Sequence, residues 1–153
     1  MDEIKVSVIV PAYNTEGYIE RMITCLLKQT YTNLQLIFID DGSTDKTAKI
    51  IKSFKDPRIE YYYQKNSGVS AARNLGLNKV TGDKIFFFDS DDTFGPCLIK
   101  DCIEYVKAND VESVLYGYGN KINGELTDEH VFKIDGIYRN DRILNELLPA
   151  FLG

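Results

Sequence analysis

The sequence predicts an α/β fold in which helices cover both faces of a mostly parallel sheet. Over the first 118 residues, short apolar runs alternate with segments whose apolar residues recur at helical spacing. This alternation is typical of strand–helix–strand units, whose strands run parallel. The chain has 153 residues, 44% of them hydrophobic, with no linker and no internal repeat. We therefore expect residues 1–153 to form a single domain with its own core.

The strands are predicted from runs of β-branched and aromatic residues that are bounded by turn residues. The first strand is expected to stop at Pro11, and the fourth consists of four consecutive apolar residues, Ile85 to Phe88. An apolar run without polar alternation indicates a strand that is buried on both faces. The expected strands are 6–10, 34–39, 59–63, 85–88 and 113–118.

The helices are predicted from apolar periodicity between these strands. From Thr15 onward, apolar pairs repeat every four positions, which marks one face of a helix. A second helix is expected to begin at a Ser43 or Thr44 cap and to end before Pro57. Further helices are expected over 70–78, from Pro96 onward and over 139–148, with a polar loop or short hairpin at 119–137.

Charge and composition exclude several classes of function. The formal net charge is -5, and the acidic excess lies wholly in residues 101–153, which carry 5 Lys/Arg and 10 Asp/Glu. Duplex nucleic acid is therefore a poor electrostatic partner for that part, and no nucleic-acid partner is expected. A single histidine, His130, leaves little material for histidine-based metal sites or a Ser-His-Asp triad.

The chain shows no pattern of secretion or membrane insertion. Its three cysteines match no zinc-binding spacing, so reduced thiols are expected. The first residues do not resemble a secretory signal, and no apolar stretch approaches the 18 residues that suggest a transmembrane helix. We expect a cytoplasmic protein, a location that also allows peripheral attachment at the inner face of the membrane.

Acidic residues follow two of the predicted strands. Asp40 and Asp41 come after the second strand, and Asp89, Asp91 and Asp92 come after the fourth. In parallel sheets the strand ends meet at one rim, where ligands bind. Carboxylates crowded there would repel one another unless a cation were present. Oxygen ligands without His or Cys suit Mg²⁺ or Mn²⁺, whose shell is commonly completed by substrate phosphates. The pattern therefore predicts a metal site and a phosphorylated ligand.

The alternative interpretation of each acid is a cap or turn residue, because Asp is common in both. For Asp45 this alternative is preferred, since it lies in the first turn of an expected helix and meets the positive end of the helix dipole. For Asp89 and Asp91 a site is preferred, because two acids separated by one residue follow a wholly apolar strand.

Recognition of a nucleotide would depend on side chains. Neither GxGxxG nor GxxxxGK[ST] is present, so the usual glycine-rich phosphate loops are excluded. Tyr13 offers a ring on which a base can stack, although an aromatic packed at the strand end is the alternative. Asp41 offers an acceptor for the N3–H of uracil, whereas cytosine presents an acceptor there. Uridine is thereby favoured over cytidine.

Four segments in this order resemble the inverting family 2 glycosyltransferases with the GT-A fold, a Rossmann-like arrangement. The resemblance covers about residues 4–120 and implies a nucleotide-sugar donor, with UDP-sugar expected. The segments are VSVIVPAYNTEGYI, IDDGSTDKT, SGVSAARNLGL and GDKIFFFDSDD.

The resemblance also implies roles for individual residues. Pro11, Tyr13 and Asp41 would frame the uracil. Asp89, the first residue of the DxD motif, would approach the ribose and share in metal binding, and Asp91 would bind the metal on the diphosphate. Asp92 would assist near the donor sugar or the metal, and is the catalytic residue expected in this chain. Arg73 would lie beside the donor diphosphate, with an ordinary exposed helix arginine as the alternative.

In this family an acceptor hydroxyl displaces the nucleotide with inversion, and a carboxylate general base takes its proton. That base belongs to a downstream acceptor-binding half, and no matching motif is present here. We therefore expect this chain to bind donor with weak or no transfer, and the apolar face of its last helix to drive self-association into a homo-oligomer. The acceptor, a saccharide or a lipid-linked sugar, is unidentified, and bacterial polysaccharide or glycoconjugate synthesis is the expected setting.

Two other functions remain open at this stage. IFFFDSDDT also satisfies the hhhhDxDxT pattern of haloacid-dehalogenase-type phosphohydrolases, in which Asp89 would be a phosphoryl-accepting nucleophile. That motif normally opens the chain, whereas here three predicted strands precede it. The second alternative is a non-catalytic nucleotide-binding module.

Overall fold

The computed structural model describes residues 4–111, 114, 118–122 and 125–130. The chain divides into two compact units, Met1–Asp101 and Cys102–Gly153, which are described separately. The first contains every residue predicted for the site. In the second unit, β5 (Tyr118–Ile122) and β6 (Glu125–His130) form an antiparallel pair, in agreement with the hairpin predicted there. The predicted helix at 139–148 and most of the predicted strand at 113–118 lie outside the described residues.

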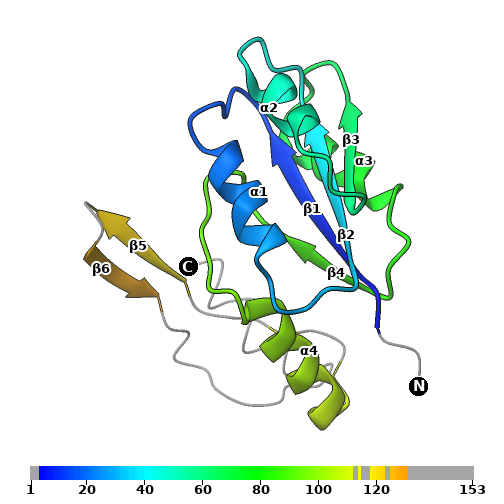
Figure 1. The fold of residues 1–153 in the computed structure, drawn as a ribbon, viewed down its shortest axis with the longest axis vertical. Coiled ribbons are helices and arrows are strands. Elements are labelled where there is room, and N and C mark those ends of the chain that lie inside the picture. The colour runs from blue at the N-terminus through cyan, green and yellow to red at the C-terminus, as the bar shows by residue number, and fades with distance from the viewer. Residues whose placement is uncertain (1–3, 112–113, 115–117, 123–124, 131–153) are drawn as a thin grey trace, which may run out of the picture. The chain divides into compact units, whose positions relative to one another are not determined.

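A parallel sheet of four strands forms the centre of the first unit. Its strands are β1 (Val6–Ala12), β2 (Leu34–Asp40), β3 (Ile59–Tyr63) and β4 (Lys84–Phe87), in the order β3-β2-β1-β4 (Figure 1). The chain moves outward from β1 to β3 and then returns to the other side of β1. The strand order therefore reverses between β1 and β4, the kind of position where α/β sheets bind ligands.

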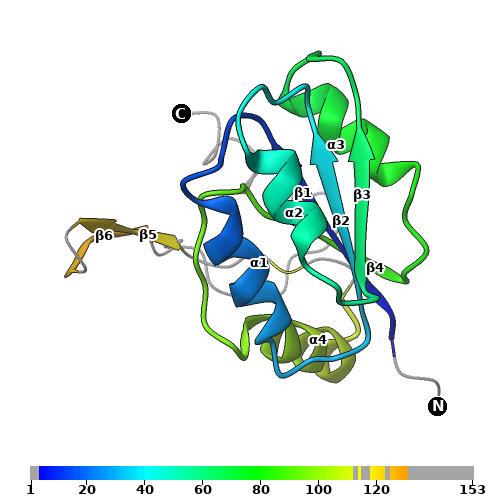
Figure 2. The ribbon, with the colours of Figure 1, turned by 45° about the horizontal axis from the view of Figure 1, so that its top comes forward.

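Helices cover both faces of this sheet, which confirms the predicted fold class. α1 (Ile19–Leu27) and α2 (Thr47–Ser53) lie on one face, and α3 (Val69–Leu77) lies on the other (Figure 2). On the α3 face, a fully buried cluster is formed by Ile9, Ile37, Ile39 and Ala72. α3 approaches closely because Gly76 has no side chain: a Cβ there would lie 2.5 Å from Ile9 Cγ2.

The first strand continues through Pro11, so the predicted stop there is wrong. Pro11 is paired with Ile39 of β2, and the strand ends at Ala12. Ile9 accepts a hydrogen bond from Phe88 on the β4 side, and Pro11 faces the same side because alternate residues do. The β1–β4 ladder has ended by that point, so the missing N–H of proline removes no ladder bond.

β4 is also less buried than its apolar sequence predicts. Ile85 and Phe87 are 41% and 42% exposed, whereas burial on both faces is expected from the run. They pair with Ser7 and Ile9 of β1, and α3 packs on that face against β1 and β2. β4 is one of the two edge strands of the described sheet, and its side chains on this face are left partly exposed by the described residues.

Helices α1 and α2 begin later than the sequence predicts. α1 begins at Ile19 rather than near Thr15, and α2 begins at Thr47 rather than after a Ser43 or Thr44 cap. Lys46 precedes α2 and provides no side-chain cap. α4 spans Leu98–Asn109, in agreement with a helix after Pro96. Within the described residues, no helix has the length and apolar character needed to cross a membrane.

Candidate functional site

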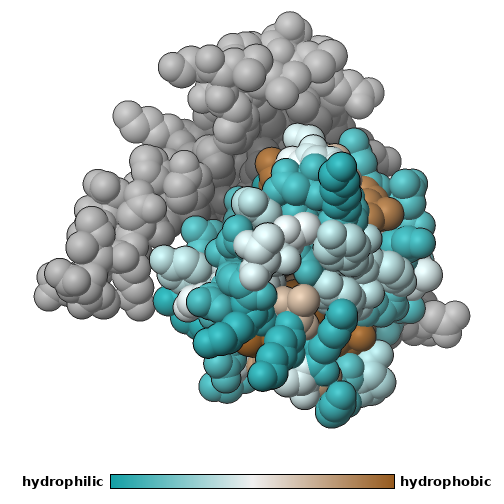
Figure 3. Space-filling model, turned by 90° about the horizontal axis from the view of Figure 1, so that it is seen from above, coloured by the Kyte–Doolittle hydropathy of each residue, from teal (hydrophilic) through white to brown (hydrophobic). Residues whose placement is uncertain are grey.

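The loops that follow β1, β2 and β4 carry the predicted site residues. Tyr13 follows β1, Asp41 follows β2 and Asp89 follows β4. Figure 3 is viewed from the side toward which the arrowheads of β1 to β3 point in Figure 1, and the described surface there is largely hydrophilic. Pro11 is buried within β1, whereas Tyr13 is 50% exposed, so its ring is available for stacking.

The first loop (residues 13–16) and the second loop (residues 43–47) are joined by hydrogen bonds in both directions. Asn14 has a left-handed backbone, with a φ of 51°, and its N–H donates to Ser43 Oγ at 3.0 Å. The Asn14 side-chain oxygen accepts in return from the Thr44 N–H at 2.8 Å. These contacts hold the backbone beside Tyr13 and place the second loop before α2 begins.

Acidic side chains complete the same connection. Asp45 accepts from the Glu16 N–H at 3.0 Å and from the Thr47 N–H at 2.9 Å, and Glu16 accepts from the Lys46 N–H at 3.0 Å. The pKa of Asp45 is lowered: burial opposes ionisation, but the hydrogen bonds from Thr47 and Glu16 outweigh it. Asp45 is therefore a structural residue just before α2, as the cap interpretation predicts.

Asp40 is directed into the protein rather than toward the rim. It is 1% exposed, and its carboxylate accepts from the Ser43 N–H at 2.8 Å and from the Tyr61 hydroxyl at 2.7 Å. Burial and this hydrogen bond raise the pKa of the Tyr61 phenol well above its usual range. Asp40 thus connects β2 to β3 through its hydrogen bond from Tyr61.

Asp41 is also buried, at 4% exposure, and its carboxylate holds the third loop (residues 64–68). Its Oδ1 accepts from Gln64 Nε2 at 2.6 Å and from the Ser67 N–H at 2.8 Å, and its Oδ2 accepts from the Gly68 N–H at 2.8 Å. Sequence reasoning identified Asp41 but missed Gln64. The only sequence signal for Gln64 was its position immediately after the strand ending at Tyr63.

Asp89 forms an ion pair with Arg73 of α3. Arg73 Nη2 lies 2.6 Å from Asp89 Oδ1, and the two side chains are 36% and 55% exposed. The Arg73 Nε atom is buried and has no hydrogen-bond partner among the described residues. The structure thus brings together two residues that the sequence analysis assigned separately to the nucleotide.

Asp91 and Asp92 complete the acidic turn (residues 89–92). Asp92 Oδ2 accepts from the Asp89 N–H at 3.0 Å, and its own N–H donates to the Asp89 carbonyl at 3.1 Å. Burial, together with the charges of Asp89 and Asp91, raises the pKa of Asp92. The Asp91 backbone carbonyl accepts from Arg21 Nη2 of α1 at 3.0 Å. Arg21 is a second residue that sequence reasoning missed.

The five carboxylates expected at the rim do not form one cluster. The part of the chain that the structure describes has no group of three or more His, Cys, Asp or Glu residues placed to hold a metal ion. Asp40 and Asp41 are occupied by internal hydrogen bonds. The exposed Asp91 carboxylate makes no hydrogen bond or ion pair within the described part of the chain. Asp91 with Asp89 therefore fits a hard cation only where a substrate supplies further oxygen ligands.

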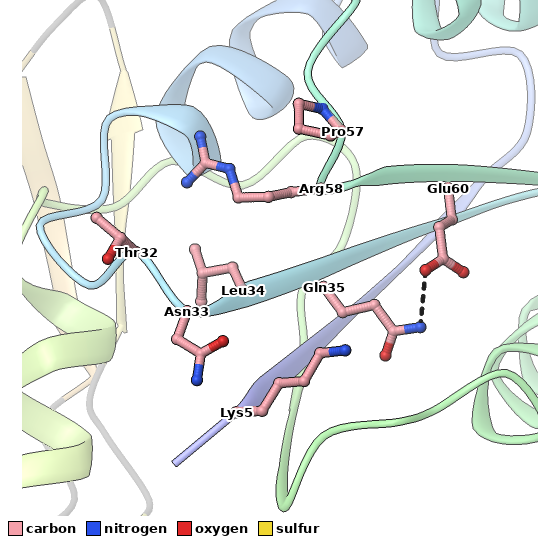
Figure 4. Close-up of a pocket in the computed structure, with 8 residues that line it drawn as sticks. All are labelled: Lys5, Thr32, Asn33, Leu34, Gln35, Pro57, Arg58 and Glu60. Carbon is pink, nitrogen blue, oxygen red and sulfur yellow. Dashed lines mark hydrogen bonds between the residues drawn. The ribbon is translucent and has the colours of Figure 1, made fainter. Parts of the chain in front are cut away.

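A cavity of about 310 Å³ lies at the opposite end of the sheet, where the strands begin. Figure 4 shows it near the starts of the first three strands, with Gln35 donating to Glu60 at 3.0 Å. Its Arg58 is already paired with Asp56 at 2.9 Å. None of the predicted site residues lines this cavity, and α/β sheets bind ligands at the other end, beyond the carboxyl ends of the strands. It is lined by Lys5, Thr32, Asn33, Leu34, Gln35, Pro57, Arg58 and Glu60.

Comparison with known proteins identifies the family. The profile of the family described as Glycosyl transferase family 2 matches residues 7–151. The chain belongs to glycosyltransferase family 2. The resemblance seen in the four motifs is thereby confirmed, and this assignment is preferred to the phosphohydrolase alternative.

Several bacterial family 2 members resemble this chain. Glycosyltransferase GlyA of Streptococcus pneumoniae is 43% identical over 66% of this chain and 15% of its own length. Glycosyltransferase GlyG of the same organism is 37% identical over 75% of this chain and 39% of its own length. An uncharacterized glycosyltransferase of Rickettsia typhi is 32% identical over 94% of this chain and 45% of its own length. The chain thus spans less than half the length of these family 2 relatives.

Solved structures of S. aureus TarS confirm the GT-A fold of this family 2 chain. TarS 1-349 in complex with UDP-GlcNAc has a TM-score of 0.69 and 27% identity, over 86% of this chain and 39% of that one. The complex of TarS 1-349 with UDP has a TM-score of 0.67 and 26% identity, over 86% and 40% of the two chains.

Proposed function

We propose that this chain provides the donor site of a glycosyltransferase that uses a UDP-sugar and a divalent cation. The observation that carries the proposal is the arrangement after β4: the Arg73–Asp89 ion pair and the exposed Asp91 carboxylate lie at the point where the strand order reverses. An arginine can bind the oxygens of a diphosphate directly, and carboxylates can bind a metal ion that contacts the same diphosphate.

The base end of the nucleotide is assigned to the loops after β1 and β2. Tyr13 is 50% exposed, which allows a base to stack on its ring, and Pro11 lies two residues before it, within β1. Asp41 Oδ2 accepts one internal hydrogen bond, which leaves capacity for the N3–H of uracil. Support for a uridine nucleotide comes from TarS, which has been solved with UDP and with UDP-GlcNAc.

Asp91 and Asp89 are the residues that would hold Mn²⁺ or Mg²⁺. Carboxylate oxygens without nitrogen or sulfur ligands match the preference of both ions. When bound, the ion would supply Lewis-acid stabilisation of negative charge on the diphosphate. Arg73 would add a fixed positive charge on the α3 side, and Asp92 would hold the backbone of the acidic turn through the Asp89 N–H.

Transfer itself belongs to the whole protein in this proposal. We expect displacement with inversion at the sugar carbon, and a carboxylate base that takes the proton of an acceptor hydroxyl. No general-base motif of the family follows the acidic turn in this sequence, and the family 2 relatives extend well beyond the length of this chain. We accordingly expect these 153 residues to bind donor with little or no turnover.

Titration calorimetry with UDP, with and without Mn²⁺, tests the proposal. The unaltered chain should bind UDP more tightly with Mn²⁺, and Asp91→Asn should lose that gain. Asp83→Asn is the matched control, because Asp83 precedes β4 at the opposite end of the same strand and accepts a hydrogen bond from the Lys5 N–H. Equal Mn²⁺ dependence in the unaltered chain and Asp91→Asn would remove the metal role, and absence of UDP binding would remove the donor site.

A further inference from the structure

We propose that Gln64 is a positioning residue that orients Asp41 and thereby sets the preference for uracil over cytosine. The inference rests on the proposed function, since it assumes that Asp41 faces the base of a bound nucleotide. Gln64 touches no nucleotide in this proposal. It acts on Asp41 through the 2.6 Å hydrogen bond from its side-chain amide.

The hydrogen bonds of Asp41 divide unequally between its two oxygens. A carboxylate oxygen offers two lone pairs. Oδ1 uses both, one for Gln64 Nε2 and one for the Ser67 N–H, whereas Oδ2 uses one for the Gly68 N–H. A single acceptor position therefore remains, and it lies on Oδ2.

The backbone of Gln64 is held at the end of β3, which fixes the point from which its side chain reaches Asp41. Its backbone N–H donates to the Asp40 carbonyl at 2.9 Å, directly beyond the end of β3. The Ser67 and Gly68 donors are backbone N–H groups, which among the natural residues only proline would remove. Among the three donors to Asp41, Gln64 is the one whose contribution a side-chain substitution can delete.

Deleting the side-chain amide of Gln64 changes the orientation of the Asp41 carboxylate toward the base and leaves the charge of the site unchanged. Without the Gln64 amide, Oδ1 regains a lone pair and the Asp41 carboxylate loses one of the three contacts that limit its rotation. Uracil N3–H then meets a less well-oriented acceptor, so UDP affinity should fall. Cytosine presents a lone pair at N3, which is repelled by an oxygen held in place but tolerated by one that turns aside. CDP affinity should therefore stay the same or rise.

The test is to measure UDP and CDP affinities of Gln64→Met and Ser67→Ala by calorimetry in the presence of Mn²⁺. Ser67→Ala is the matched control: it removes the Ser67 Oγ hydrogen bond to the Lys65 carbonyl, at 2.7 Å, but keeps the Ser67 N–H that binds Asp41. In Gln64→Met we expect UDP affinity to fall about tenfold, a loss of about 1.4 kcal/mol, with no loss of CDP affinity. In Ser67→Ala the ratio of the two affinities should stay unchanged.

An equal fall in UDP and CDP affinity in Gln64→Met would overturn the inference, because it would indicate a purely structural role. Unchanged affinities for both nucleotides in Gln64→Met would overturn it as well, while leaving the UDP site intact. If the unaltered chain bound no UDP, the proposed function would fail together with this inference. A measurement on the unaltered chain adds to the test: the side-chain amide resonance of Gln64 should shift on saturation with UDP, and an unmoved resonance would contradict the orientation role.

Discussion

Replacing Gly42 by alanine should destabilise the first unit and loosen the third loop. Gly42 has a φ of 77°, in the left-handed region, and a Cβ there would lie 2.8 Å from the Asn66 backbone nitrogen. The conformation costs an L-residue about 1–2 kcal/mol. The overlap involves backbone, which cannot rotate away, and forcing extra atoms into packed structure typically costs about 1–3 kcal/mol. We expect the free energy of unfolding to fall by about 2–5 kcal/mol, a large share of a typical domain's stability.

Urea denaturation followed by tyrosine fluorescence measures this change, because the chain has 10 tyrosines and no tryptophan. Gly17→Ala is the matched control: nothing lies within 4 Å of a Cβ there, and its φ is outside the left-handed region. It should be neutral or stabilising by up to about 1 kcal/mol. A Gly42→Ala variant as stable as Gly17→Ala would refute the reasoning. The displaced third loop should also weaken UDP binding, since that loop supplies the donors to Asp41.

Three further predictions concern side chains of the site. Tyr61→Phe should lower the free energy of unfolding by about 1–3 kcal/mol in urea denaturation, since it leaves the buried Asp40 carboxylate one donor short; a neutral variant would contradict this. The raised pKa of Asp92 means that the native state binds its proton more tightly than the unfolded chain, so stability should decline as pH rises above the ordinary value of 3.8. Asp92→Asn should flatten that decline in a series of denaturation curves, and superimposable pH profiles would count against it. Arg73→Met should change stability by less than about 1 kcal/mol, because its ion pair with Asp89 is partly exposed, yet lower UDP affinity more than about tenfold in calorimetry. An affinity equal to that of the unaltered chain would exclude Arg73 from the diphosphate site.

The sequence predicted the order of elements well because that order depends on periodicity. β3 has the predicted bounds, Ile59–Tyr63, and α3 differs from its predicted span by about one residue. The errors arose where contacts between distant segments decide the outcome. The start of α2 is set by hydrogen bonds from Thr44 and Lys46 to the first loop, about 30 residues earlier, and no local capping rule includes these.

The candidate site divides in the same way. Residue type and position after a strand selected Asp89 and Asp91, whereas Arg73 was selected through the family resemblance. The sequence pattern could not show that the Asp41 carboxylate is buried against the third loop, because the pattern is the same for an acid whose carboxylate meets solvent. Gln64 was missed for a related reason: a glutamine has no distinctive chemistry until its partner is known.

The reciprocal hydrogen bonds between the first and second loops bear on how donor preference can be re-engineered. Each loop satisfies its own backbone with side chains borrowed from the other, as Asn14 and Ser43 illustrate. Replacing only one of the two segments by that of a relative would leave backbone N–H groups of the other segment without their hydrogen-bond acceptors. Chimaeras between members of this family should thus exchange 13–16 and 43–47 as a matched set, and co-inheritance of the two stretches is what a library of shuffled sequences ought to recover.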